Sequence, residues 1–427
     1  MAAPRFPTAS LQGLSWLGIQ PPPASAVAAV KTALASTAGV WHLSDHQIGE
    51  TSALISASKA FFDQPAARKW SCVVPPMDRS RGWEMYPQHL RFHRGVMASR
   101  GHAAEPGRSH AEPSAAEGIL CERFVCGPPV VCNDDAAAPF AAHPFYSSRW
   151  ARVFYERNRW PTGRDATESN LRAEMELVYP KLERVALASA QLLAAALGVP
   201  HTAFDKLITT ASASHPEAPL RHHSRLQINN YPSQLRWGKR FNNRTSLPIR
   251  ASRHFDTSLL TVLCRMPSVD NHELHAGSSG ALEVYLSAER QWVCVPARPE
   301  EVTVFLGNLA GLLTGFALQG TTHRVTNPAE DAIERARRLS IGFNLKPDYG
   351  ARAMPPPLVR AHLTGLPQVD SEKVPLIGLV GRVGWQNHAM QTRGLSRIEA
   401  VSSFKGWKNE MVGKLRSKDS YGAACVY

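Results

Sequence analysis

The segments Arg253-His254-Phe255-Asp256 and Thr322-His323-Arg324-Val325 bring two imidazoles and a carboxylate into one region of the chain. In a strand, side chains two residues apart point to the same side, so His254 and Asp256 can hold one ion from one strand end. Enough residues then follow for several short strands to return the chain at His323. Two His and one carboxylate on one face, with the other positions open, form the ligand set of mononuclear Fe(II) sites. His254, Asp256 and His323 are therefore the predicted metal ligands and catalytic residues.

A second motif, Arg338-Leu339-Ser340, follows one hairpin after His323. The guanidinium of Arg338 can hold a carboxylate through two hydrogen bonds, and Ser340, two residues later on the same side, can add a hydroxyl. Taken alone, a His-x-Asp pair is also typical of a polar strand end or a hydrogen-bonded core histidine. The longer pattern of the chain favours the metal site.

That longer pattern resembles the plant- and fungus-type Fe(II)/2-oxoglutarate-dependent dioxygenases, the superfamily that includes isopenicillin N synthase. The segments that carry the resemblance occur in the same order as in that family, and they are residues 226–232, 280–284, 292–296, 304–308, 313–316 and 323–328. Short β-branched runs separated by Gly, Pro and Asn also suit such a fold. The resemblance implies a mainly β protein with flanking helices and a double-stranded β-helix (jelly roll) core.

The resemblance also implies the chemistry. Fe(II) would be the cofactor, with 2-oxoglutarate as co-substrate, dioxygen as oxidant and ascorbate as a reductant. Arg338 and Ser340 would anchor the distal carboxylate of 2-oxoglutarate, and Tyr231 and Asn229 would support its C1 end. The expected reaction is hydrogen abstraction from a small molecule of specialised metabolism, giving hydroxylation, desaturation or oxidative cyclisation with succinate and CO2. Halogenation is disfavoured, because halogenases of this superfamily replace the carboxylate that Asp256 supplies here.

Two alternatives stay open. One is an oxidase of the isopenicillin N synthase type, which has this fold and works without 2-oxoglutarate. The other is a non-catalytic binding protein with the same fold. The complete triad, together with Arg338 and Ser340, argues against the second alternative.

The chain divides into three expected regions. Residues 1–221 form a helical and strand region packed on the barrel, 222–347 form the jelly-roll core, and 348–427 form a C-terminal extension with a possible lid helix over 396–415. Expected elements in the first region are helices over 24–38, 52–62 and 170–197 and a strand over 39–46. Pro180 should bend or divide the longest helix, and Gly198 should end it. Residues 88–118 and 265–279 lack periodicity and are predicted loops.

Composition limits the partners. The 427 residues carry a net charge of +13, which favours acidic partners, and an acidic small-molecule substrate is preferred. Basic residues that could bind it are Arg91, His93, Arg94, Arg221, His222, His223 and Arg236. No basic run alternates with aromatic residues, so no nucleic-acid partner is expected, and no apolar run is long enough to cross a bilayer. Without a secretory signal and with seven scattered Cys, we expect a cytoplasmic monomer with reduced thiols.

Overall fold

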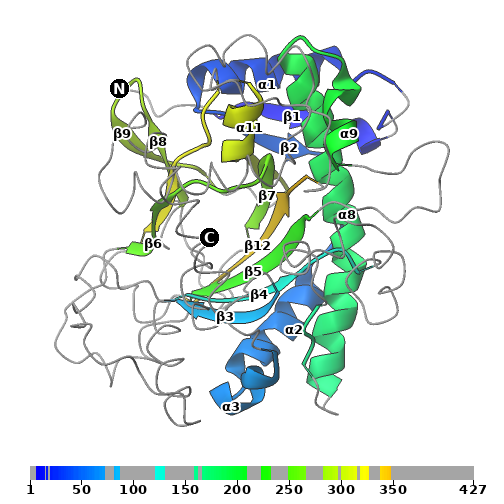
Figure 1. Ribbon diagram of the computed structural model, residues 1–427, viewed down its shortest axis with the longest axis vertical. Helices are drawn as coiled ribbons and strands as arrows, with labels where there is room; N and C mark the ends of the chain where they lie inside the picture. Colours follow the sequence, from blue (N-terminus) through cyan, green and yellow to red (C-terminus); the bar gives the residue numbers. More distant parts are fainter. Residues whose placement is uncertain are drawn as a thin grey trace, which may run out of the picture.

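The computed structural model describes residues 6–14, 16–17, 20–72, 81–86, 121–129, 158–161, 166–208, 223–231, 249–265, 282–296, 300–314, 318–326 and 337–347. Within this part of the chain the strands form one large and one small sheet, with helices beside the large one (Figure 1). The two sheets are called the major and the minor sheet below.

The major sheet has eight strands among the described residues and is antiparallel except for the parallel pair β1 and β2. In spatial order its strands are β1 (Thr8–Ser10), β2 (Val40–Ser44), β10 (Val302–Leu306), β7 (Leu260–Arg265), β12 (Arg338–Leu345), β5 (Arg225–Tyr231), β4 (Cys121–Cys126) and β3 (Gly82–Tyr86). The N-terminal region thus contributes two strands at each edge of this sheet, in addition to the helices packed on it.

The minor sheet is antiparallel and has four strands in the described ranges. Their order is β6 (Ile249–His254), β11 (His323–Thr326), β8 (Leu282–Leu286) and β9 (Gln291–Cys294). Apolar side chains of both sheets share one core cluster, in which Leu263 and Phe305 of the major sheet join Leu282 and Val284 of the minor sheet. Two antiparallel sheets packed in this way form the jelly roll that the sequence predicts.

The outer face of the major sheet is covered by helix α8 (Ala166–Ala196), which contacts β7 and β12 and runs past α1 and α2 (Figure 1). We predicted that Pro180 would bend or divide this helix; the division is wrong, because α8 is continuous through Pro180. Pro180 lies on the exposed side, so apolar residues such as Leu182 and Leu193 still reach the core. Gly198 adopts a positive φ of 74°, and the amide of Val199 bonds to the carbonyl of Ala194, which ends the helix as predicted.

The remaining helices are short. They are α1 (Ala24–Ser36), α2 (Ser52–Asp63), α3 (Ala66–Lys69), α9 (Asp205–Ile208) and α11 (Asn308–Leu313), with single 3-10 turns at Gln12–Leu14, Trp70–Cys72 and His201–Phe204. The first two helices and β2 agree with the predicted segments to within two residues. The predicted lid helix and loop 88–118 lie outside the described residues, as does all of loop 265–279 except Arg265. None of the described helices combines the length and the apolar character that crossing a bilayer requires.

A buried ion pair fastens α3 to the edge of the major sheet. The Lys69 ammonium lies 2.7 Å from the Glu122 carboxylate on β4, and both side chains are almost fully buried. Lys69 also donates to the carbonyl of Phe62, and the indole N–H of Trp83 donates to the same oxygen of Glu122 at 3.0 Å. The hydrogen bonds around the pair compensate the desolvation that burial imposes on both charges.

Candidate functional site

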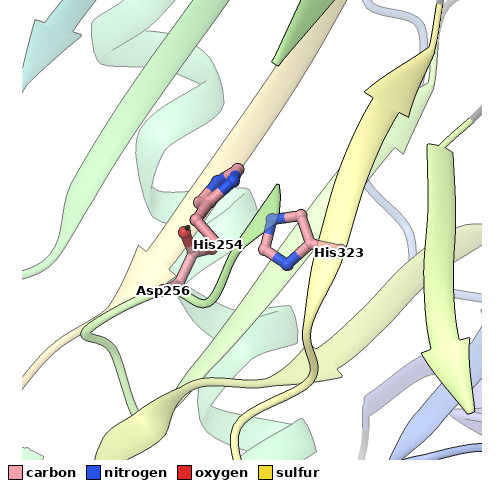
Figure 2. A group of neighbouring side chains, drawn as sticks. All are labelled: His254, Asp256 and His323. Atoms are coloured by element: carbon pink, nitrogen blue, oxygen red, sulfur yellow. Dashed lines mark ion pairs between the residues drawn. The ribbon is translucent and has the colours of Figure 1, made fainter. Parts of the chain in front are cut away.

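The two histidines of the predicted triad lie side by side on neighbouring strands of the minor sheet. His254 ends β6, His323 begins β11, and the register of the two strands pairs them directly. Their ring centroids are 4.2 Å apart. Figure 2 shows both imidazoles and Asp256 converging on one point. Neighbouring strands therefore bring together ligands that are distant in the sequence.

Asp256 reaches the same point from the segment that leads from the minor sheet into β7 of the major sheet. Its Oδ1 lies 3.9 Å from His254 Nε2. Its Oδ2 accepts hydrogen bonds from Thr261 Oγ1 at 2.5 Å and from Asn344 Nδ2 at 3.1 Å. The backbone carbonyl of Asp256 accepts from the amide of Asn308 at 2.7 Å. These contacts turn Oδ1 toward the two histidines.

The close approach of α11 to this segment requires a glycine. A Cβ built on Gly307 would lie 1.9 Å from the carbonyl oxygen of Ser258, so no larger residue fits there without a backbone shift. The amides of Gly307 and Leu309 also bond to the carbonyls of Leu259 and Ser258. The Asp256 segment is consequently held against residues 307–309 by backbone hydrogen bonds.

The protonation pattern suits a metal. His323 Nδ1 lies 3.0 Å from the carbonyl of Thr321, so the Nδ1–H donates to that carbonyl and Nε2 is left for a metal. Burial and, next, the nearby His254 lower the pKa of His323 to about 4. Burial raises the pKa of Asp256, but His323, His254 and the Thr261 hydrogen bond outweigh it and hold that pKa below its usual value. A neutral His323 and an ionised Asp256 are the forms that bind metal ions.

The donor set fits Fe(II). One ligand atom from each of His254, Asp256 and His323 lies within 4.8 Å of the others, as expected for three atoms that share one ion. Two imidazole nitrogens and one carboxylate oxygen on one side leave the remaining octahedral positions open. All three predicted ligands therefore meet in one place.

The four predicted co-substrate residues also form one group, on the inward side of the major sheet. Arg338 on β12 is paired in register with Tyr231 on β5, and Ser340 is paired with Asn229. Asn229 Nδ2 donates to Ser340 Oγ at 3.3 Å, and the Arg338 guanidinium carbon lies 5.9 Å from the centre of the Tyr231 ring. We expected Tyr231 and Asn229 at the C1 end of 2-oxoglutarate, but they lie beside the residues expected to anchor its distal carboxylate.

Sequence reasoning missed the residues that orient Asp256. Thr261 and Asn344 come from different strands of the major sheet, and their side chains also bond to each other at 2.8 Å. A signal for Asn344 was present, because it continues the two-residue alternation of Arg338 and Ser340 along one strand. Thr261 offered no comparable signal, since its bond to Asp256 depends on the path of the chain between Asp256 and the start of β7.

Comparisons with known proteins agree with this geometry. Residues 223–347 match the family model of the 2OG-Fe(II) oxygenase superfamily. The chain is 28% identical over 101 residues to deacetoxycephalosporin C synthase from Amycolatopsis lactamdurans, covering 24% of this chain and 29% of that protein. It is 25% identical over 170 residues to 2-oxoglutarate-dependent dioxygenase traH from Penicillium crustosum, covering 40% and 43%. The match therefore spans less than half the length of these curated relatives.

Among solved structures, a full-length protein from Neurospora crassa in complex with alpha-KG and thymine superposes with a TM-score of 0.56. The alignment covers 88% of this chain and 96% of that one at 16% identity, which establishes a common fold. Over residues 223–347 the chain is thus similar to the 2OG-Fe(II) oxygenase superfamily. The predicted fold is confirmed. The match to this family model supports the predicted Fe(II) cofactor and 2-oxoglutarate co-substrate.

Proposed function

We propose that this protein is an Fe(II)- and 2-oxoglutarate-dependent oxygenase that oxidises a small organic molecule. The observation that carries the proposal is the convergence of His254, Asp256 and His323, each of which places one ligand atom within 4.8 Å of those of the other two. A vestigial site would have no need for the hydrogen bonds that orient Asp256 and His323. When bound, Fe(II) and 2-oxoglutarate would supply the oxidising chemistry, with dioxygen consumed and succinate and CO2 released.

The protein's own residues hold and orient the reactants. Arg338 and Ser340 would bind the distal carboxylate of 2-oxoglutarate, since a guanidinium and a hydroxyl together match the geometry of a carboxylate. Asn229 donates to Ser340 Oγ, which leaves the hydroxyl hydrogen of Ser340 free to point at that carboxylate. Tyr231 packs beside Arg338 and restricts the positions that its guanidinium can take.

The reaction class follows from the third ligand. Asp256 occupies the position at which a halide would need to bind, so the outcome we propose is hydroxylation, desaturation or oxidative ring closure. The protein would act as a monomer in the cytoplasm on a molecule of specialised metabolism, and the positive charge of the chain favours an acidic substrate.

An anaerobic titration of the Fe(II)-loaded protein with 2-oxoglutarate tests the proposal. We expect a saturable visible charge-transfer band in the wild type and in Arg184→Gln, an exposed arginine on α8 that serves as control. Arg338→Ala should require at least tenfold more 2-oxoglutarate, because the distal carboxylate loses its charged anchor. His323→Ala should bind no stoichiometric iron.

Two results would contradict the proposal in different ways. Bound iron without a band on addition of 2-oxoglutarate would favour the oxidase that works without this co-substrate. A wild type that takes up no stoichiometric Fe(II) would favour a binding protein of the same fold.

A further inference from the structure

A second cationic group lies at the opposite end of β12 from Arg338. Side chains on the inward side of this strand alternate through Arg338, Ser340 and Asn344, and Lys346 follows two residues later. Asn344 bonds to Asp256, and Lys346 Nζ lies 3.1 Å from the hydroxyl of Thr257, the residue after that ligand. Lys346 therefore adjoins the metal centre on the side away from the 2-oxoglutarate anchor.

Lys346 has little to balance its charge. The residue is 6% exposed, and none of the ion pairs among the described residues includes it. The Thr257 hydroxyl can accept one of the three ammonium hydrogens. Burial lowers the pKa of Lys346 well below its usual value, Arg225 lowers it next, and Asp256 opposes them. A divalent cation bound to Asp256 would cancel that opposing charge. A buried ammonium in such surroundings calls for an anion.

Arg225 brings a second positive charge to the same place. It begins β5 and is paired in register with Asn344, the residue that bonds to Asp256. Its Nη2 lies 2.9 Å from Nε2 of His223, whose Nδ1 lies 3.4 Å from Nη2 of Arg81. The contact with the His223 ring fixes the direction of the Arg225 guanidinium and supplies no negative charge. Two cationic side chains thus lie where β12 ends and β5 begins, next to the Asp256 segment.

We propose that Lys346 and Arg225 form an oxyanion subsite that holds a carboxylate of the substrate being oxidised. The inference rests on the proposed function and narrows its substrate class to carboxylate-bearing small molecules. The planar guanidinium of Arg225 and the point charge of Lys346 can bind the two oxygens of one carboxylate. 2-Oxoglutarate is not the occupant, because its distal carboxylate is assigned to Arg338 and Ser340 and its C1 end to the metal, which leaves it no carboxylate for this subsite.

The test uses the full-length Fe(II)-loaded protein under anaerobic conditions with saturating 2-oxoglutarate, so that the metal site and the Arg338 anchor are filled. The probes are acetate, its neutral isostere acetamide, and inorganic phosphate, each at constant ionic strength, and the readout is the thermal unfolding midpoint. We expect acetate to raise the midpoint saturably and acetamide to leave it unchanged. Lys346→Met and Arg225→Gln should raise the half-saturating acetate concentration at least tenfold.

Matched controls separate the subsite from general effects of charge. Lys31→Met and Arg184→Gln make the same changes at exposed helix positions and should respond to acetate as the wild type does. Lys346→Arg keeps the charge and should retain the response. If far-UV circular dichroism shows that Lys346→Met does not fold, the half-saturating acetate concentration of Arg225→Gln tests the subsite in its place.

Three results would overturn the inference. The first is that acetate and acetamide change the unfolding midpoint of the wild type equally. The second is that Lys346→Met responds to acetate at the same concentrations as the wild type. A saturable response to phosphate alone would refute the carboxylate assignment. The 2-oxoglutarate band, recorded on the same samples, reports separately on the proposed function: its absence would refute that function, while the acetate response still reports on the subsite.

Discussion

At the scale of single residues, the two oxygens of Asp256 have different tasks. Oδ2 is held by Thr261 and Asn344, and Oδ1 faces the histidines. A carboxylate fixed in this way cannot rotate to offer a different oxygen, so part of the entropy of metal binding is lost already on folding. The hydrogen bonds from Thr261 and Asn344 are therefore part of the metal site, as the three ligands are.

Removing one of these supports should weaken the metal site without removing a ligand. Thr261→Val keeps the size and shape of the side chain but takes away the hydroxyl that donates to Asp256 Oδ2. We expect Fe(II) affinity to fall by about 10–100-fold, the usual effect of losing a residue that orients a ligand. Anaerobic metal titration measures it, with the exposed Thr202→Val as control. Wild-type affinity in Thr261→Val would mean that the hydrogen bond does not orient the ligand.

At the scale of elements, α8 contains a proline that should cost stability. Pro180 has no amide hydrogen to donate to the preceding turn, yet the helix continues through it. Pro180→Ala should raise the free energy of unfolding by about 1–3 kcal/mol, because alanine restores the bond and has the best helix propensity. Urea unfolding measures the change, and Arg184→Ala on the exposed side of the same helix should stay within about 0.5 kcal/mol. A loss of stability in Pro180→Ala would show that the proline stabilises the fold.

In contrast to Pro180, a residue of the ion pair between α3 and β4 should lower the free energy of unfolding when it is replaced. Glu122→Ala would leave the buried Lys69 ammonium without its carboxylate, which should cost about 3–5 kcal/mol of unfolding free energy. Glu176→Ala removes the acid of an exposed i,i+4 pair with Arg172 and should cost less than about 1 kcal/mol. Denaturant unfolding of the two variants side by side measures the contrast, and equal losses would rule out the role assigned to burial.

At the scale of the whole molecule, the metal ligands join the two sheets. His254 and His323 belong to the minor sheet, and Asp256 is held by Thr261 and Asn344 of the major sheet. Binding of a metal to the folded form alone should stabilise it by about 2.7 kcal/mol at a concentration 100 times the Kd. Thermal unfolding with redox-inactive Zn(II) and with a chelator measures this difference, which should vanish in His323→Ala. A metal effect that persists in His323→Ala would place the metal elsewhere.

The sequence alone predicted the features that depend on local periodicity. The alternation in Arg338-x-Ser340 and the apolar repeat of α8 correspond to real elements. His254 and Asp256 do meet, but β6 ends at His254, so the segment after the strand, and not strand alternation, brings Asp256 to the site. Features set by contacts between distant segments could not be predicted from the sequence. The Thr261 and Asn344 contacts to Asp256, the place of Tyr231 beside Arg338 and the continuity of α8 at Pro180 all depend on strand order and packing. A single chain read residue by residue does not contain that information.

The direct pairing of His254 with His323 has a consequence for assembly. A slip of β11 against β6 by one residue would turn one imidazole to the opposite face of the minor sheet. A chain that closed its barrel in the wrong register would therefore lack the site altogether. The iron occupancy of a preparation should therefore report the fraction of molecules in which these two strands have paired in the correct register.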